Sequence, residues 1–537
     1  MMFRHSLTMN LMMFRTILTM HLMMFGHILR MVNSSLRLGN DVGSISDISS
    51  LPEFDDGYVE LDSGHEGWVA VGSSEAQQQH LPETWNRWSS ALKRLLQIPM
   101  TQGSSTLRVG TLCSGTDSPI QALHEILGLG DCVSHVYSVD HWEVSRKFIC
   151  ANFEPSHMYK NVDDILLDHG ANCCTCSSPR CRAYQEEVDL LVMGFPCKPF
   201  SSLNMSRYDD GYNPFLHPEA KPLFILQKFL KKKAKDKHNP KVIILENVFG
   251  LLTPIRNKKM AQRYSRPIDI ILNGITTMED DGQVQKYKHG LNFVKDYATF
   301  YCVLDALASG LPMRRRRVFI IMVRVDVYTQ SAFDMFSMLF RKVVQHPLAP
   351  SPLHSFVRVE TLEPTMHRLC RPKKKARTSA SDADTSQANH GLLPSGPKAF
   401  SRSARPELLA SMTTREVSVC DCIFDFMMKT EQCIPDDLII TVSESLSRKP
   451  WSIGAKIPFL SCGCKIYYHK IGAILNFATL FQIAGWNPDA LIVPATITDG
   501  NLRKLVGNMV CVPTIGTIEL LVLRCFFPRI LGIEHAT

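Results

Sequence analysis

The sequence predicts an α/β fold built on a doubly wound, mostly parallel sheet, with a smaller additional region. The first observation is a set of short runs rich in Val, Ile and Leu, at 107–113, 133–139, 188–194, 241–245 and 318–323. The second is a set of segments with helical spacing between those runs, such as 118–127, 143–152 and 222–232. Strands that alternate with helices are typical of βαβ units and of a parallel sheet covered on both faces. Ligands of such sheets bind at the carboxyl ends of the strands.

Length and composition describe an ordinary soluble globular chain. Its 537 residues are enough for two or more domains with substantial cores. The chain is 45% hydrophobic and 20% charged, and its 17 cysteines are scattered, which favours reduced thiols over a disulfide framework. The most apolar late run, 518–532, is interrupted by Arg524 and Arg529, so we expect no membrane span.

Polar segments flank the predicted sheet strands. Residues 1–32 hold three near-copies of an eleven-residue unit and no acidic residue. Such a start is typical of an organelle transit peptide, although we favour a low-complexity leader. Residues 33–105 are polar and acid-rich, which predicts a tether. Residues 371–404 are polar with few aromatics, which predicts disorder, and RPKKKAR at 371–377 fits a nuclear import signal or a solvated loop equally well.

The charge balance says little about partners. The net charge of +8, from 59 basic and 51 acidic residues, is weak evidence for a polyanionic partner. Basic clusters at 231–233, 314–317 and 373–375 suit phosphate contacts, and a solvated face is the alternative for each one.

Cys197 stands at the carboxyl end of a predicted buried strand. Residues 188–204 read VDLLVMGFPCKPFSSLN, and the prolines on either side of Cys197 restrict the backbone there. A cysteine in such a place acts as a nucleophile if its thiolate is favoured. A lone cysteine after a strand is more often inert, so the interpretation depends on its partners.

Two further runs supply candidate partners. VIILENV at 242–248 ends a second buried strand in Glu246, which is costly to bury unless it is paired or protonated. Either state suits an acid that donates to a ring nitrogen, and a strand-end hydrogen bond is the alternative. In PMRRRRVF at 312–319, alternation along an extended chain places Arg315 and Arg317 on one face. Their guanidinium groups can donate to a carbonyl oxygen or to phosphate.

The order GFPCxPFS, ENV, RRRRVF resembles that of the cytosine-5 methyltransferase family, whose best-known members modify DNA. VGTLCSGTDSPI at 109–120 resembles the family's first motif, and YSVDHWEVSRKFICANF at 137–153 resembles the second. VGNMVCVP at 506–513 resembles the last motif, and LFQIAGWNP at 480–488 faintly resembles the one before it. The matches span 107–325 and 471–523 in family order.

This resemblance implies a Rossmann-like methyltransferase domain with a smaller target-recognition region. The domains expected are a leader and tether at 1–105, a catalytic domain at 106–330, a target-recognition region at 331–470 with its disordered basic insert at about 371–404, and a segment at 471–537 that completes the catalytic domain.

The resemblance also implies the activity of a DNA (cytosine-5-)-methyltransferase. Such an enzyme transfers a methyl group from S-adenosylmethionine to C5 of cytosine in DNA through a covalent adduct, here with Cys197. By the family's chemistry the thiolate adds to C6, Glu246 stabilises the protonated N3, and Arg317 together with Arg315 donates to O2. The target base must leave the duplex stack to react.

The cofactor pocket follows from the resemblance in the same way. Its expected residues are Cys113, Gly115, Ser118, Asp140, His141, Asp164, Ile165, Pro196, Leu223, Asn508 and Val510. Gly507 is expected to close the pocket together with Asn508.

The sequence departs from the family pattern at several positions. Lys198 replaces a glutamine after the nucleophile, and Met313 replaces another at the start of the arginine motif. Asp117-Ser118 stands where the family carries paired glycines, and Cys113 where it carries an aromatic residue. The penultimate motif has no clear arginine. These changes bear on cofactor affinity and on domain closure.

A group of cysteines lies in one loop, at Cys173, Cys174, Cys176 and Cys181. Zinc needs four well-placed ligands, and the spacing of these four is irregular. We therefore expect a reduced loop and no metal.

Three other functions are compatible with parts of this sequence pattern. A transfer-RNA cytosine-5 methyltransferase shares this catalytic core, but the Cys-Phe-Thr signature typical of that branch is absent from the recognition region. A catalytically silent nucleic-acid-binding relative is the second. A dehydrogenase is disfavoured because no G-x-G-x-x-G follows the first strand. DNA is the expected partner, with RNA as the alternative, and the nucleus is the expected location, with an organelle as the alternative.

Overall fold

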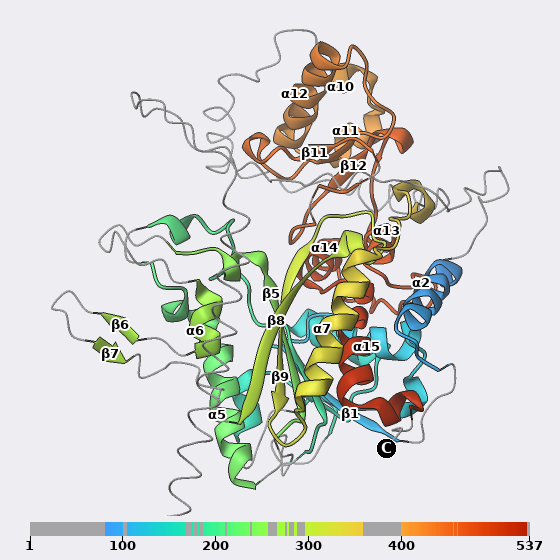
Figure 1. Ribbon diagram of the computed structural model, residues 1–537. Helices are drawn as coiled ribbons and strands as arrows, with labels where there is room; N and C mark the ends of the chain where they lie inside the picture. The colour runs from blue at the N-terminus through green and yellow to red at the C-terminus, as the bar shows by residue number, and fades with distance from the viewer. Residues whose placement is uncertain are drawn as a thin grey trace, which may run out of the picture. The chain divides into compact units, whose positions relative to one another are not determined.

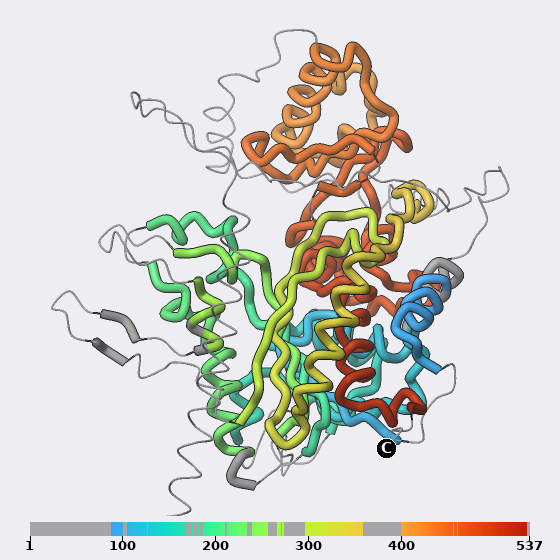
Figure 2. Tube along the Cα trace, viewed as in Figure 1, coloured from blue at the N-terminus to red at the C-terminus, as the bar shows by residue number. Residues whose placement is uncertain are grey.

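The computed structural model describes residues 81–99, 105–167, 173–176, 181, 186–209, 212–236, 239–255, 266–273, 276–278, 284–286, 296–357, 399–454, 456–458 and 460–533. All of them belong to one compact unit, Ser73–Thr537 (Figures 1 and 2). The repeated leader, most of the expected tether and the basic heptapeptide at 371–377 lie outside the described residues.

A seven-stranded sheet forms the centre of this unit. Its strands are β1 (Leu107–Leu112), β2 (Val133–Val139), β3 (His157–Tyr159), β4 (Leu190–Met193), β5 (Val242–Val248), β8 (Tyr297–Asp305) and β9 (Arg316–Arg324). The spatial order is β3-β2-β1-β4-β5-β9-β8, with β1 to β5 parallel and β9 antiparallel to both β5 and β8. The strand order reverses between β1 and β4, and sheets of this kind bind ligands at that point.

Helices cover both faces of the sheet, which confirms the doubly wound α/β class. Along β9, Phe319 and Ile321 pack into one core, and Val318 and Ile320 pack into the other. The helices α7 (Gln330–Gln345) and α15 (Val512–Phe526) lie on the first face, and α5 (Lys221–Asp236) and α6 (Pro267–Asn273) lie on the second (Figure 1). Strands buried on both sides read as continuous apolar runs, and this is why these runs were recognisable in the sequence.

Other helices and strands lie around the sheet. They are α2 (Leu81–Leu95), α3 (Ser118–Gln121), a π-helical turn at Ala122–Ile126, α4 (Glu143–Asn152), the β6–β7 pair (Thr276–Met278 and Val284–Lys286), α13 (Phe477–Ile483) and α14 (Asp499–Asn508). The expected helix at 118–127 is thus one helical turn followed by a π-helical turn, whereas the helix expected at 143–152 is α4.

One stretch within the described residues, Asp499–Phe526, is long and apolar enough to cross a membrane by length and composition. However, 89% of its apolar window is buried inside the protein, as in the core helix of a soluble domain. Helix α15 within it packs against α3, the π-helical turn and α7. Its hydrophobicity therefore matches its position in the core beside β1.

A separate core forms between residues 399 and 474. It contains α10 (Ala399–Ser403), α11 (Pro406–Ser411), α12 (Thr414–Thr430) and the strands β10 (Ile439–Thr441), β11 (Trp451–Ser452), β12 (Ile466–Tyr468) and β13 (Ala473–Ile474). The rings of Phe400, Phe424 and Tyr467 pack edge to face or tilted at its centre. We call residues 399–474 the small lobe.

Two boundaries differ from the sequence-based expectation. Residues 331–345, which the expected boundaries place in the recognition region, form α7 together with Gln330, and its Phe336 and Leu339 belong to the core of the sheet. The last residues of the segment expected to be disordered form α10, because Phe400 is fully buried in the small lobe. In α7 the buried apolar side chains recur with helical spacing, whereas in α10 one buried ring, Phe400, orders the end of a polar segment.

Glu519 in α15 generates a prediction about stability. Its side chain is fully buried, and neither carboxyl oxygen has a hydrogen-bond partner among the described residues. Burial raises the pKa of Glu519 well above its usual range. The folded state therefore holds this proton more tightly than the unfolded state, so stability is highest below the unfolded pKa of about 4.3 and falls as pH rises. We expect Glu519→Met to raise the free energy of unfolding at neutral pH by about 1–3 kcal/mol, with a smaller gain at pH 5.

The matched control is Glu416, a buried glutamate that has partners. It accepts from the Thr413 amide at 2.7 Å and lies 2.8 Å from Lys465 Nζ. Glu416→Met should lower stability, since it removes those contacts. Denaturant unfolding at several pH values measures both variants, and a loss of stability in Glu519→Met would contradict this account.

Candidate functional site

The loop that carries Cys197 lies where three strands end. Gly194 follows β4, and a Cβ added there would lie 3.7 Å from both Cys113 O and Glu246 Oε2. The ends of β1, β4 and β5 therefore meet at this glycine. The loop is closed by the Phe200 amide, which donates to Cys197 O at 2.9 Å. Asn247 Nδ2 donates to Phe195 O at 2.8 Å, so the residue after Glu246 fixes the strand-to-loop junction.

Arg207 fastens the far side of this loop and was not anticipated from the sequence. Its buried guanidinium donates through Nη1 to Phe200 O, and through Nη2 to Gly250 O at 2.9 Å and Thr253 O at 2.5 Å. It joins the segment after Cys197 to the segment after β5. A single arginine in a polar loop gives no sequence signal of such a role, because two of its three acceptors are carbonyls more than forty residues away.

Glu246 and Arg317 form a buried ion pair at the edge of the site. Arg317 Nε lies 2.8 Å from Glu246 Oε1. The pair exists because β9 runs antiparallel to β5, with Arg317 opposite Val248. Burial raises the pKa of Glu246, and the two guanidinium groups of Arg317 and Arg315 oppose that shift. The carboxyl therefore holds a proton to higher pH than a solvent-exposed glutamate does.

The charges of Glu246 and Arg317 also act on Cys197. Its side chain is exposed, yet loss of solvation raises the pKa of its thiol. The positive charge of Arg317 favours the thiolate, and the negative charge of Glu246 disfavours it. The structure thus brings Cys197, Glu246 and Arg317 into one electrostatic site. A protonated Glu246 leaves the arginine to favour the thiolate, which is the combination needed for a nucleophile beside an acid.

Arg315 lies beside this site but is committed to backbone carbonyls. Its Nη1 donates to Leu460 O at 2.6 Å, and its Nη2 donates to Gly507 O at 2.9 Å and Met509 O at 2.6 Å. It is buried, as the alternation along the chain predicts, whereas Arg314 and Arg316 are exposed. Its donors join the arginine strand to the small lobe and to the end of α14.

The turn after β1 has an unusual backbone. Cys113, Gly115 and Asp117 have φ values of +51°, +61° and +56°, in the left-handed region that favours glycine. Asp117 is held there by hydrogen bonds to its carboxylate from Thr111 Oγ1 at 2.6 Å and from Ser138 Oγ. These bonds explain how an aspartate occupies a position where the family carries glycine. Burial raises the pKa of Asp117 to about 7.

Asp140 joins this turn to the end of β2. Its Oδ2 accepts from the Gly115 amide and its Oδ1 from the Trp142 amide, both at 2.8 Å. Burial raises the pKa of Asp140. His141 is exposed beside it, and Ser118 is buried at the start of α3. A Cβ on Gly115 would meet no atom within 4 Å, so space is open next to the buried carboxylate.

The other expected cofactor residues are placed differently from one another. Asp164 is buried, and its Oδ2 accepts from the Asn161 amide at 2.9 Å in a capping box. Ile165 and Leu223 are fully buried in the core on the α5 side of the sheet. Ile165 and Leu223 therefore pack beneath the expected cofactor pocket and expose no surface to it. Pro196 is half-buried directly before Cys197.

The final motif approaches the site from the end of α14. Asn508 is exposed and Val510 is half-buried, and Met509 between them accepts from Arg315. A Cβ on Gly507 would lie 2.4 Å from Cys462 Cα, so only glycine permits this close approach to the small lobe. The role expected for Gly507 is therefore supplemented by a packing requirement.

The faint motif at 480–488 forms α13 and the turn after it. Phe481 stacks on Phe148 of α4 with ring centroids 5.5 Å apart, and Trp486 meets Phe148 edge to face at 5.3 Å. Although this motif lacks a clear arginine, Arg503 of α14 donates to Cys464 O at 3.4 Å and Leu475 O at 2.9 Å. A buried arginine thus joins α14 to the small lobe.

Comparison with protein families gives one matching model, described as C-5 cytosine-specific DNA methylase, over residues 108–269. The match includes Cys197 and Glu246 and ends before β9, the arginine strand that begins at Arg316. The Type II methyltransferase M.BsuFI of Bacillus subtilis is 30% identical over 141 residues, 26% of each chain. The DNA (cytosine-5-)-methyltransferase DMT5 of Cryptococcus neoformans is 27% identical over 168 residues, 30% of this chain and 6% of that one. The chain thus aligns with about a quarter or less of these relatives.

Solved structures give a weaker likeness. The Entamoeba histolytica methyltransferase EhMeth has a TM-score of 0.38 at 12% identity, covering 78% of this chain and 99% of that one. The Schizosaccharomyces pombe Dnmt2 methyltransferase has a TM-score of 0.37 at 12% identity, with the same coverage. Scores of this size support no argument, and the fold assignment depends on the strand order given above.

The contacts of Arg315 predict a structural role that can be separated from chemistry. Arg315→Met leaves three carbonyl oxygens without their donor, of which those of Leu460 and Met509 are buried. We expect a loss of about 2–5 kcal/mol in the free energy of unfolding. Arg316→Met is the matched control, because Arg316 is exposed and lies 4.4 Å over the Phe249 ring. Its cost should stay below about 1 kcal/mol. Equal costs for the two variants in denaturant unfolding would contradict this role.

Proposed function

We propose that this chain is a C-5 cytosine-specific DNA methylase, the family whose model matches residues 108–269, and that it transfers a methyl group from S-adenosylmethionine to C5 of cytosine in DNA. The single observation that supports this most is the buried pair of Glu246 with Arg317 beside the Cys197 loop. A nucleophile, a proton donor and a cation next to one another are what the reaction requires of the protein.

In the proposed mechanism, the Cys197 thiolate adds to C6 of an extruded cytosine and forms a carbon–sulfur bond. Glu246 donates its proton to N3, so negative charge does not build up on the ring. Arg317 donates to O2 once the base is bound. C5 then carries the electron pair that would take the methyl group, with the neutral thioether of the donor as the leaving group. A base removes the C5 proton, the carbon–sulfur bond to C6 breaks to release the Cys197 thiolate, and N3 returns its proton to Glu246. Burial raises the pKa of Glu246, which is the direction that a proton donor requires.

S-adenosylmethionine would supply the electrophilic methyl group. Asp140 would accept from hydroxyl groups of its ribose, in keeping with a buried carboxylate next to open space at Gly115. The left-handed turn at Cys113 to Asp117 would place backbone groups against the cofactor without side-chain obstruction. Asp164, His141 and Val510 are proposed to complete the pocket.

We propose Arg315 as a positioning residue in this mechanism. Its two terminal nitrogens are engaged by Leu460, Gly507 and Met509, and its Nε is buried without a partner among the described residues, so the terminal nitrogens have little left to offer the base. Its charge still favours the Cys197 thiolate. Arg317 contacts Glu246 through Nε and donates through Nη1 to Arg316 O, and it is the proposed ligand of O2.

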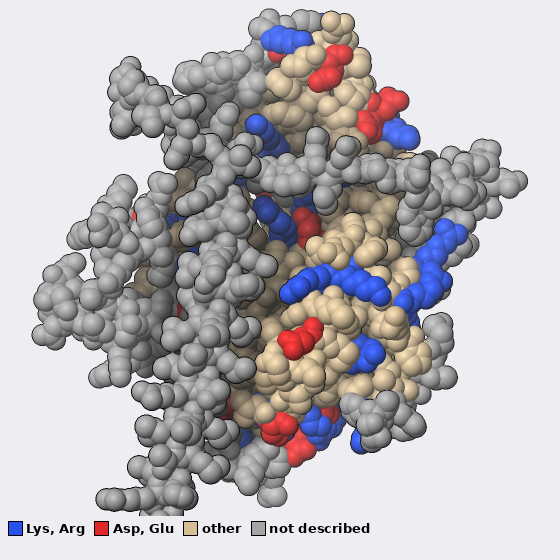
Figure 3. Space-filling view, in the orientation of Figure 1, with Lys and Arg blue, Asp and Glu red and all other residues tan. Residues whose placement is uncertain are grey.

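DNA as the partner is supported by exposed groups around Cys197 rather than by overall charge. Leu203, Met205 and Tyr208 follow the nucleophile and are 52%, 71% and 55% exposed. Such side chains can contact bases that have lost their stacking. On the visible face in Figure 3, basic side chains lie in separate groups among acidic and neutral ones.

The nucleus remains our proposed location.

One basic cluster is assigned to structure rather than to phosphate. Lys232 Nζ donates to Leu166 O at 2.8 Å, and Lys233 Nζ, which belongs to a buried residue, donates to Glu186 O at 2.6 Å. These lysines close the loops next to α5.

The nucleophile is tested by Cys197→Ser. We expect methyl transfer to fall at least about 1000-fold, on the scale seen when an essential nucleophile is lost. Cys433→Ser is the matched control, since Cys433 is also exposed but lies after α12 in the small lobe. Transfer of labelled methyl groups to duplex DNA and, in parallel, to transfer RNA measures both variants. A Cys197→Ser enzyme at near wild-type rate would refute the mechanism. Methyl transfer to transfer RNA alone would show that RNA, and not DNA, is the substrate.

The acid is tested by the pH profile of Glu246→Gln. The rate should follow the product of ionised thiol and protonated Glu246, because both states are required together. The wild-type rate therefore falls again at high pH, whereas the variant should lose about 3 kcal/mol of transition-state stabilisation and lack that fall. The pH dependence of kcat/KM for methyl transfer measures this for both enzymes. An unchanged high-pH limb in the variant would show that another group donates the proton.

A further inference from the structure

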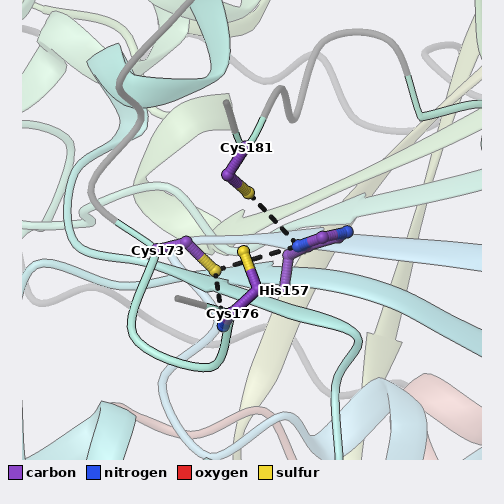
Figure 4. A group of neighbouring side chains, drawn as sticks. All are labelled: His157, Cys173, Cys176 and Cys181. Atoms are coloured by element: carbon purple, nitrogen blue, oxygen red, sulfur yellow. Dashed lines mark hydrogen bonds between the residues drawn. The ribbon is translucent and has the colours of Figure 1, made fainter. Parts of the chain in front are cut away.

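A cluster of four side chains lies away from Cys197, at the β3 edge of the sheet. The ligand atoms of His157, Cys173, Cys176 and Cys181 all lie within 4.8 Å of one another (Figure 4). Cys181 Sγ is 3.3 Å from His157 Nδ1, and Cys173 Sγ is 3.8 Å from the same nitrogen. One imidazole and three thiols thus point at one small volume.

The donor set and its spacing match zinc. Three thiolates and one imidazole form a common closed zinc site, and C-x₂-C spacing as in Cys173 and Cys176 is typical of such sites. A tetrahedron with Zn–S of about 2.3 Å and Zn–N of about 2.0–2.1 Å holds two sulfurs about 3.8 Å apart and a sulfur and a nitrogen about 3.5–3.6 Å apart. The ligand atoms lie within 4.8 Å of one another, so shifts of about 1 Å or less reach that geometry. Soft thiolate ligands also disfavour magnesium and calcium.

The groups around the cluster orient its ligands. His157 presents Nδ1 to the sulfurs, and its other nitrogen, Nε2, lies 3.8 Å from Glu186 Oε1. Histidines that bind metals usually have a carboxylate or carbonyl at the second nitrogen, which fixes the tautomer. Glu186 is held in turn by Lys233, which donates to its carbonyl oxygen. Tyr159 Oη lies 3.1 Å from Cys181 Sγ.

The backbone around the thiols is also fixed. The Cys174 amide donates to Met158 O at 2.7 Å, and Cys173 pairs with Tyr159 in an isolated β-bridge. Thr175 Oγ1 accepts from the Met158 amide at 3.1 Å and donates to Ser156 O at 3.1 Å. The Cys176 amide points at Cys173 Sγ at 3.4 Å, which favours a thiolate there. The cysteine loop is therefore bound along β3, the strand that carries the histidine.

We propose that His157, Cys173, Cys176 and Cys181 bind one zinc ion with a structural role. Four protein ligands fill a tetrahedral site and leave no open position for substrate, which distinguishes structural from catalytic zinc. The ion would join β3 to the segment that follows the Asp164 turn, a proposed part of the cofactor pocket. This inference replaces our expectation of no metal. The sequence alone pointed to four cysteines, of which Cys174 is exposed and outside the cluster.

The test uses the full chain, purified with a reductant and no added metal. Elemental analysis should find one equivalent of zinc in the wild type. Cys176→Ser should lower it to background, and Cys174→Ser, the matched control two residues away, should keep the full equivalent. Replacement by Co²⁺ should give the intense visible bands of a tetrahedral site and a thiolate-to-cobalt charge-transfer band. His157→Cys should retain metal, because four thiolates also form a closed site.

A second variant tests the contact of the histidine without touching a ligand. Glu186→Gln should weaken zinc binding about 10–100-fold in a chelator competition. The proposal is overturned if the wild type binds no zinc and shows no tetrahedral cobalt spectrum, if the thiols are found in disulfides under reductant, or if Cys174→Ser loses as much metal as Cys176→Ser. Metal content is measured without methyl transfer, so failure here and failure of the proposed function remain distinct.

Discussion

The antiparallel pairing of β9 with β5 is the constraint on which the site depends. If β9 ran parallel to β5, its last residues would lie at the site. Its first residues, which include Arg317, would then lie at the other end of the strands. Because β9 is reversed, its first residues lie beside the carboxyl end of β5, and Arg317 reaches Glu246. A buried pair of this kind is costly to desolvate. Its retention is explained if the arginine and the acid are needed at one place for chemistry.

Buried arginines hold the surrounding segments in place by a common device. Arg207, Arg315 and Arg503 each donate to backbone carbonyls that lie far away in the sequence. A guanidinium offers five donors in a fixed plane and keeps its charge, so it can satisfy several loop carbonyls that a helix or sheet leaves unpaired. The nucleophile loop, the arginine strand and the small lobe are each fixed in this way, and the proposed zinc would fix the opposite edge of the sheet.

Much of the sheet was predictable because β4, β5 and β9 carry buried apolar side chains on both faces and β1 and β2 are largely buried. The strand β3 has only three residues, and β8 is an edge strand with partly exposed side chains, so neither gives a clear run. Cys197, Glu246 and Arg317 stand at strand ends within recognisable motifs. In contrast, Arg207, Arg503 and His157 gave no local signal, because their partners come together only in the fold. His157 precedes the first thiol of its cluster by 16 residues.

The central claim is that Cys197 attacks a cytosine held by Glu246 and Arg317. Duplex DNA that carries 5-fluorocytosine tests it most directly. A base cannot remove fluorine from C5 as it removes the C5 proton, so the adduct stays covalent after methyl transfer. With S-adenosylmethionine present, mass spectrometry of the digested complex should find the modified base on the peptide that contains Cys197. A cross-link to a different cysteine, or no cross-link from protein that methylates ordinary duplex DNA, would contradict the account.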